Sequence, residues 1–291
     1  MPPEAPRPDQ IIGDYPFLLE YSVLASPDMM VTVLRQQRVV RELELILSSL
    51  LDFRVWSLGP NYRKHWCFDV SDGQVRFPSK FLQEGYGWDG PQPSGDDFTD
   101  TNAFISVALI EINQYYSMRG ISIDRSLDLP ADLPQQLDRF FALTTTDREK
   151  FLRASYWFQH AGTVFSYSKS ASFIALVSAV EALMPEPSAG EPCPQCKQRI
   201  GAGPTRRFVE FVESTVPNSG ISNQERRRFY RVRSALAHGG KLLAVDHNNW
   251  GFTPKQLGED YDARTMWRIV QIVLHNWLAQ SIAADHEQMS R

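Results

Sequence analysis

The sequence has 291 residues and a formal net charge of −4, and 43% of its residues are hydrophobic and 22% are charged. This length suits one large domain or two ordinary ones. No apolar run is long enough to cross a membrane, and the Pro-rich residues 1–6 lack the apolar core of a signal peptide, so we expect a cytoplasmic protein. Three cysteines, two of them in one CxxC, argue against a disulfide framework.

The first part of the chain, residues 1–126, mixes the two-residue period of strands with the longer period of helices. Val39, Leu43 and Leu47 lie at helical spacing and predict a long amphipathic helix. We therefore predict an α+β domain, in which no spacing matches a catalytic motif. In chain order we expect a strand at 15–24, a helix at 31–51, strands at 54–59 and 65–77, a loop at 85–100 and a buried helix at 101–118.

Helical periodicity dominates after a boundary that we place within residues 121–133, so residues 127–291 are predicted to form an all-α bundle. Capping boxes at 146–149 and 222–225 each predict the beginning of a helix. The glycine pair at 239–240 predicts the end of the second of these helices. The expected helices span about 146–165, 170–183, 205–216 with Thr205 as its cap, 222–238 and 261–284.

Charge is distributed unevenly along the chain. Residues 197–241 carry ten Lys or Arg against three Glu, a net +7, so the rest of the chain carries −11 to reach the total of −4. A basic segment in an acidic chain indicates a polyanion partner, and a solvated helix face is the alternative.

Residues 229–240 form the most informative segment. Arg233 and His238 are separated by four residues, Ser234 directly follows the arginine, and Gly239 directly follows the histidine. This arrangement resembles the RSxxxHG string that closes a helix in HEPN domains, and more narrowly in the Apea-like HEPN group.

The resemblance extends beyond this string. Residues 176–183 are similar to the family's upstream helix, with Glu181 at its acidic position, and residues 203–208 are similar to the start of its next helix. Together the similar segments span about 127–284. Active HEPN proteins are metal-independent endoribonucleases, often toxins or antiviral effectors, and they usually act as dimers whose motifs meet at a shared cleft.

The resemblance implies that Arg233 and His238 are catalytic, that Ser234 belongs to the same site, that RNA is the substrate and that the chain forms a homodimer without a required cofactor. The residue types suit this chemistry. Histidine exchanges a proton near neutral pH, and a helix C-terminus favours its protonated ring. A planar guanidinium holds a phosphate through two hydrogen bonds.

Neighbouring residues are expected to support this pair. The basic candidates for RNA binding are Arg226, Arg227, Arg231 and Lys241. Glu181 and Tyr230 are the candidates for structural support, and Tyr230 is expected to pack rather than to react.

A structural interpretation stays open for each catalytic candidate. Arg233 could pair with Glu181 across two packed helices, and His238 could serve as a helix-end hydrogen-bonding residue. On an ideal helix the two side chains point about 140° apart, because five residues each turn by about 100°. Either the last turn distorts at Gly239, or a second chain completes the site.

Cys193 and Cys196 form the CxxC and resemble half of a zinc knuckle. Structural zinc takes four ligands, so a second chain would have to supply the others, and a pair of reduced loop thiols is the alternative.

Three functions fit these observations. The first is an HEPN-type endoribonuclease. The second is a catalytically inactive HEPN module for dimerisation or for RNA or nucleotide binding, since a fold does not fix an activity. The third is an antitoxin-like partner of a nucleotidyltransferase.

Overall fold

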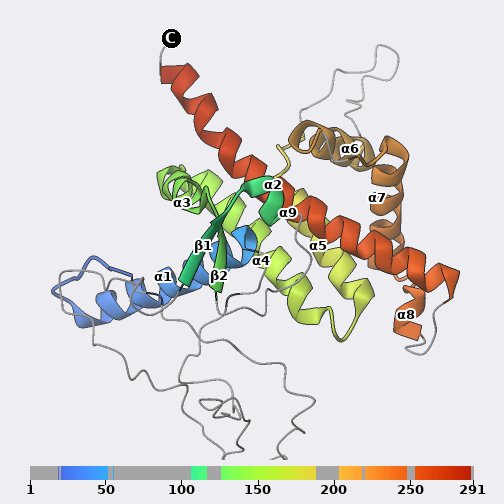
Figure 1. The fold of residues 1–291 in the computed structure, drawn as a ribbon, viewed down its shortest axis with the longest axis horizontal. Helices are drawn as coiled ribbons and strands as arrows, with labels where there is room; N and C mark the ends of the chain where they lie inside the picture. The colour runs from blue at the N-terminus through green and yellow to red at the C-terminus, as the bar shows by residue number, and fades with distance from the viewer. Residues whose placement is uncertain are drawn as a thin grey trace, which may run out of the picture. The chain divides into compact units, whose positions relative to one another are not determined.

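A computed structural model of the chain describes residues 19, 21–51, 55, 106–116, 126–187, 203–217, 220–247 and 253–289. The described chain is mostly helical, with a small two-stranded parallel sheet (Figure 1). None of its described helices combines the length and apolar composition that a membrane crossing needs. The predicted strands at 54–59 and 65–77 and the loops at 85–100 and 185–204 fall largely or wholly outside the described residues.

Contacts along the chain divide it into two compact units. One unit comprises residues 1–40 and 56–105, and the other comprises residues 41–55 and 106–291. The second unit therefore includes both strands and the end of the first helix in addition to the C-terminal helices. The boundary that the sequence suggests near residue 126 stays a prediction.

Helix α1 (Met29–Leu50) confirms the long helix predicted at 31–51. It begins where the Asp28 carboxylate accepts a hydrogen bond from the Met30 backbone N–H at 2.8 Å. The strand predicted at 15–24 is wrong for residues 19 and 21–24, which have no regular structure. The Leu24 carbonyl instead accepts a hydrogen bond from the Arg35 guanidinium at 2.8 Å, so this segment is held by the helix that follows it.

The two strands lie where the sequence predicts a buried helix and a domain boundary. Strand β1 (Ser106–Ile110) pairs in parallel with β2 (Ser126–Pro130), Ser106 opposite Ser126. The helix predicted at 101–118 is therefore wrong over β1, and within the described residues 106–116 the helical part is the short α2 (Ile112–Tyr115). A short apolar run with β-branched residues is compatible with a helix or with a strand. Here the run forms a strand because β2, later in the chain, pairs with it.

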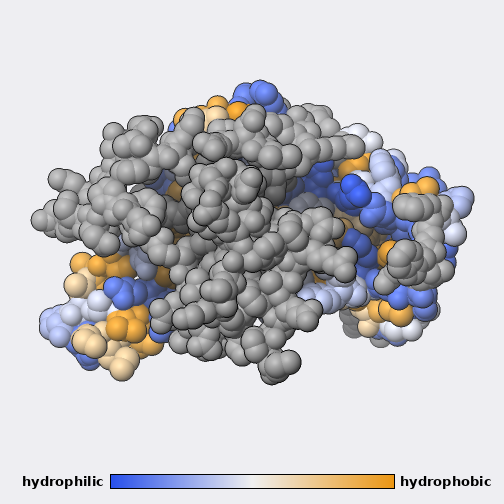
Figure 2. Space-filling view, turned by 60° about the horizontal axis from the view of Figure 1, so that its bottom comes forward, coloured by the Kyte–Doolittle hydropathy of each residue, from blue (hydrophilic) through white to orange (hydrophobic). Residues whose placement is uncertain are grey.

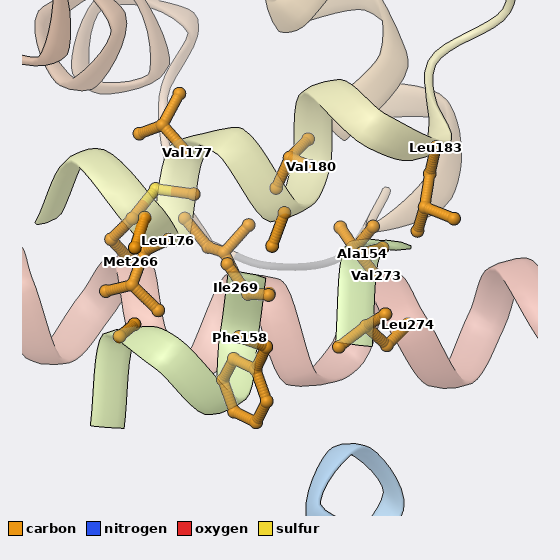
Figure 3. Close-up of a cluster of buried hydrophobic side chains, with 14 of the residues drawn as sticks. Ala154, Phe158, Leu176, Val177, Val180, Leu183, Met266, Ile269, Val273 and Leu274 are labelled. Carbon is orange, nitrogen blue, oxygen red and sulfur yellow. The ribbon is translucent and has the colours of Figure 1, made fainter. Parts of the chain in front are cut away.

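The core of the second unit lies between α4 (Thr145–Val164), α5 (Lys169–Leu183) and α9 (Pro254–Met289). Figure 3 shows side chains from these three helices directed toward one another. Helix α5 buries residues around most of its circumference, as expected for a helix with neighbours on several sides. The buried side chains include Ala154 and Phe158 from α4, Leu176, Val177, Val180 and Leu183 from α5, and Met266, Ile269, Val273 and Leu274 from α9.

Several helix beginnings differ from the prediction. The cap of α4 is Thr144, whose hydroxyl accepts from the Asp147 N–H, and not Thr146. Helix α6 (Pro204–Thr215) begins after Gly203 with a proline in its first turn, so Thr205 lies inside it. The sequence analysis also missed α3 (Leu133–Ala142) and α8 (Ala244–His247), and α9 begins seven residues before the predicted 261.

Asp246 fixes the beginning of α5 from a distant part of the chain. Its carboxylate accepts hydrogen bonds from the Ser168 hydroxyl and from the backbone N–H groups of Lys169 and Ser170, each at 2.8 Å. These donors are ones that a helix N-terminus leaves without partners inside the helix. Burial raises the pKa of Asp246, but the hydrogen bonds from Ser170, Ser168 and Lys169 outweigh it and lower the pKa overall.

We expect Asp246→Asn to lower the free energy of unfolding by about 1 kcal/mol at neutral pH, because a charged acceptor at a helix N-terminus becomes a neutral amide. A lowered pKa in the folded state means that this stability is present above the carboxyl's unfolded pKa and is lost as the pH falls through its folded pKa. Urea unfolding at pH 7 and at pH 3 measures both effects. Glu210→Gln, which removes an exposed pairing with Arg206, is the control and should change little. An Asp246→Asn chain as stable as the wild type at pH 7 would contradict the assignment.

Candidate functional site

The candidate site lies at the end of α7 (Asn223–Ala237), whose beginning is the predicted capping box. The Ser222 hydroxyl accepts from the Glu225 N–H, and the Glu225 carboxylate accepts from the Ser222 N–H at 2.9 Å. The capping box confirms the predicted beginning of the helix. Gly239, which adopts a φ of 69° beyond the last turn, confirms its predicted end. That conformation suits a residue without a Cβ and lets the Gly240 N–H reach the Ala235 carbonyl at 2.9 Å.

Arg233 is held by an acidic residue on the neighbouring helix α5. Its Nη2 donates to Glu181 Oε2 at 2.6 Å, and both side chains are about a quarter exposed, at 24% and 26%. The Tyr230 hydroxyl donates to the other oxygen of Glu181 at 2.9 Å. The predicted pairing of Arg233 with Glu181 and the predicted packing role of Tyr230 are thus confirmed.

Tyr230 is fixed as a proton donor in this group. Burial raises the pKa of its hydroxyl, and the hydrogen bond to Glu181 raises it further. Tyr230 therefore keeps its proton near neutral pH and orients the carboxylate that holds Arg233. The Nε of Arg233 is buried and has no hydrogen-bond partner among the described residues, so Glu181 satisfies only part of this guanidinium.

His238 is the residue that closes α7, and it is exposed. Its backbone N–H donates to the Ser234 carbonyl at 3.1 Å, so the helical turn persists as far as His238. Its imidazole has no hydrogen bond to any residue in the described part of the chain. The ring is therefore accessible to a ligand, and the helix-end function belongs to its backbone.

Helix geometry separates Arg233 from His238. Because the turn between them is helical, the distortion at Gly239 begins too late to rotate His238, and the two side chains leave the axis about 140° apart. Ser234 is partly buried, and its hydroxyl hydrogen-bonds none of the described residues. A single copy of α7 therefore does not bring Arg233 and His238 to one face.

The same geometry places His238 in line with two predicted RNA-binding residues. Arg227 and Arg231 precede it by eleven and seven residues, so all three lie within about 20° of one line along α7. Both arginines are exposed, and neither has an ion pair with a described residue. The sequence analysis did not identify this alignment, although the spacing alone would have revealed it.

Arg226 is a correction to the predicted set. Its side chain is 4% exposed, its Nη1 donates to Asn223 Oδ1 at 2.8 Å, and it lies 3.7 Å from a Glu213 oxygen. It precedes the buried Phe229 and Tyr230 by three and four residues, so it shares their inward face. Arg226 is thus a structural residue and not a free cation on the surface.

The remaining cations differ in their surroundings. Lys241 is exposed just beyond the glycine pair. Arg228 forms an ion pair with Asp262, Nη2 to Oδ1 2.5 Å. In Figure 2, hydrophilic side chains predominate over the right-hand part of the described surface, with a few hydrophobic ones between them. We call three exposed cations the basic face of α7: Arg227, Arg231 and Lys241. The two arginines are aligned with His238, and Lys241 follows the end of the helix.

The predicted zinc ligands Cys193 and Cys196 lie outside the described residues. Among the residues that are described, no group of three or more His, Cys, Asp or Glu is arranged to hold a metal ion. The zinc site stays a prediction.

Comparison with protein-family models, with curated proteins and with solved structures finds no match to this chain.

Proposed function

We propose that the chain is an RNA endonuclease of the HEPN type, with Arg233 and His238 as its catalytic residues and an N-terminal α+β domain that recruits or senses a partner. The observation that carries the proposal is that one helix end presents two such groups on different sides. One is the exposed imidazole of His238 at the end of a basic helix face, and the other is a partly exposed arginine that a carboxylate and a tyrosine hold in place. These are the residue types that transesterification of RNA needs.

The proposed reaction uses the RNA's own 2′-hydroxyl. Its oxygen attacks the adjacent phosphorus, the bond from phosphorus to the 5′-oxygen breaks, and the products end in a 2′,3′-cyclic phosphate and a 5′-hydroxyl. One proton leaves the 2′-oxygen and one must reach the departing 5′-oxygen. His238 moves protons at this step, as histidines do near neutral pH. Arg233 stabilises the charge on the non-bridging phosphate oxygens.

We propose that the site is composite, with Arg233 of one copy and His238 of a second copy acting on the same phosphodiester. The angle between the two side chains on one helix supports this arrangement, because a single copy directs them apart. A two-fold axis would place each Arg233 opposite the other copy's His238 and would create two equal sites. The chain would thus act as a homodimer.

Glu181 has a positioning role in this proposal. Its hydrogen bond from Tyr230 leaves it oriented toward Arg233, and the ion pair fixes the guanidinium through Nη2 only. Among the described residues, Nη1 of Arg233 has no hydrogen-bond partner. It remains a donor for a phosphate oxygen.

The test is cleavage of a fluorescently labelled single-stranded RNA by the purified full-length chain in excess EDTA. We expect cleavage to continue, with 2′,3′-cyclic phosphate and 5′-hydroxyl ends, because arginine supplies the charge stabilisation that a metal ion would otherwise provide. Products with 5′-phosphate ends, or cleavage that EDTA abolishes, would contradict this mechanism.

A second function, a module that binds RNA or a nucleotide without cleaving it, is favoured by the Arg233–Glu181 ion pair. The pair neutralises part of the charge that a nuclease would present to phosphate. In that case the basic face of α7 would bind RNA with an affinity that falls steeply with salt, and no products would form.

A further inference from the structure

A cluster of aromatic side chains lies on α4, away from the residues that the proposed function uses. Tyr156 and His160 are one helical turn apart, their rings are nearly parallel at 5°, and their centroids are 6.1 Å apart. Trp157 meets both rings edge-on at 5.7 and 5.9 Å. The Arg41 guanidinium, from the last part of α1, lies 6.0 Å over the Tyr156 ring.

This cluster occupies the outer side of α4. The inner side of the helix buries Phe151, Ala154 and Phe158 in the core, whereas Tyr156 is 46% exposed. His160 and Trp157 are partly exposed. The core therefore does not account for Tyr156, nearly half of which is exposed to solvent beside its contacts with Arg41, Trp157 and His160.

Two arginines, Arg153 and Arg41, accompany the aromatic side chains of this cluster. Arg153 precedes Tyr156 by one turn, is exposed, and forms no ion pair with a described residue. Arg41 is held in place by Glu44 and by Gln159, each at 3.0 Å from Nη1. An exposed ring in contact with one guanidinium, with a second exposed arginine one turn earlier on its helix, is suited to stacking a nucleobase and attracting the neighbouring phosphates.

We propose that this surface binds a single-stranded segment of RNA by stacking a base on Tyr156. It comprises Arg153, Tyr156, Trp157 and His160 of α4 and Arg41 of α1. The inference rests on the proposed function for its choice of RNA. Helices α4 and α7 both pack against α5, and Figure 1 shows them apart. Within one copy, the bound segment is thus separate from the residues of α7 that the proposed function uses.

The test measures binding in a chain that does not cleave. In a His238→Ala background, the Kd for a fluorescein-labelled 20-nucleotide single-stranded RNA is measured by fluorescence anisotropy, with a single-stranded DNA of the same sequence in parallel. Tyr156→Ala should raise the Kd for RNA roughly 5- to 150-fold, the effect of losing one stacked base. Tyr156→Phe keeps the ring and should bind as the background does. Phe141→Ala removes an exposed ring from α3 and is the matched control.

The outcomes separate this inference from the proposed function. An unchanged Kd in Tyr156→Ala overturns the inference, even if the wild-type chain cleaves RNA. A Tyr156-dependent Kd supports the inference, even if the wild-type chain cleaves nothing. Tyr156→Ala that lowers the midpoint of thermal unfolding and leaves the Kd unchanged assigns the ring to packing within the chain. Equal weakening of DNA binding would widen the ligand class to any single strand and overturn the choice of RNA.

Discussion

His238→Ala is expected to reduce the rate of RNA cleavage by at least about 10²- to 10⁴-fold, the contribution of a general acid or base. The reason is that His238 is the residue proposed to act as the general acid or base of the reaction. The fold should be unaffected, because the side chain is exposed and hydrogen-bonds none of the described residues. The rate is measured with labelled RNA in EDTA, and the fold is checked by thermal unfolding.

His247→Ala is the matched control, because this histidine is also exposed at the end of a short helix and has no part in the proposed site. It should cleave at the wild-type rate. Arg233→Lys should cleave much more slowly, since an ammonium keeps the charge but loses the planar pair of donors. A His238→Ala chain that folds and cleaves at the wild-type rate would exclude this site.

Asp132→Asn is expected to give the largest loss of stability, about 3 kcal/mol, because a charged acceptor of hydrogen bonds from largely buried side chains becomes a neutral amide. Asp132 Oδ2 lies 2.6 Å from His275 Nε2 and accepts a hydrogen bond from Gln136 at 2.8 Å. The pair joins the beginning of α3 to the middle of α9, and His275 is 8% exposed. The amide of asparagine would replace a charged acceptor in this low-dielectric surrounding.

The same group makes a prediction about acid. Burial raises the pKa of Asp132, but the hydrogen bonds to His275 and Gln136 outweigh it, so the pKa lies below its ordinary value. The contribution to stability is therefore present above the carboxyl's unfolded pKa and is lost as the pH falls through its folded pKa.

Urea unfolding at pH 7 and at pH 3 tests both statements. The difference in stability between wild type and Asp132→Asn should be large at pH 7 and should shrink at pH 3, which lies below the carboxyl's ordinary pKa in the unfolded chain. Asp138→Asn changes an exposed carboxylate on the same helix and should be nearly neutral at both values. A difference that stays constant between the two pH values would contradict the stabilising role of the Asp132 carboxylate.

Local signals made helices α5 and α7 predictable. The capping box at Ser222 and the glycines after His238 predicted both ends of α7, and the apolar run in α5 predicted its span to within one residue. These features depend on side chains close in sequence, which is why the sequence reveals them. The pairing of Arg233 with Glu181 could also be anticipated from the sequence, because both residues belong to recognisable helices.

Features that depend on distant parts of the chain were not predictable. Strand β1 requires β2, and Asp246 finds its donors at the beginning of α5, about 77 residues earlier in the chain. No local pattern encodes such pairings. Arg226 is different, because its spacing of three residues from Phe229 already indicated the buried face of α7. The sequence analysis predicted an RNA-binding role from its positive charge instead.

The central claim is that Arg233 of one copy and His238 of another act on one phosphodiester, and mixing two inactive variants tests it most directly. Arg233→Ala and His238→Ala chains are mixed in equal amounts, unfolded and refolded together, and assayed for RNA cleavage. Random pairing makes half of the dimers mixed, each with one intact site of two, so we expect about a quarter of the wild-type rate. A mixture as inactive as either variant, next to an active wild type refolded in the same way, would contradict the composite site.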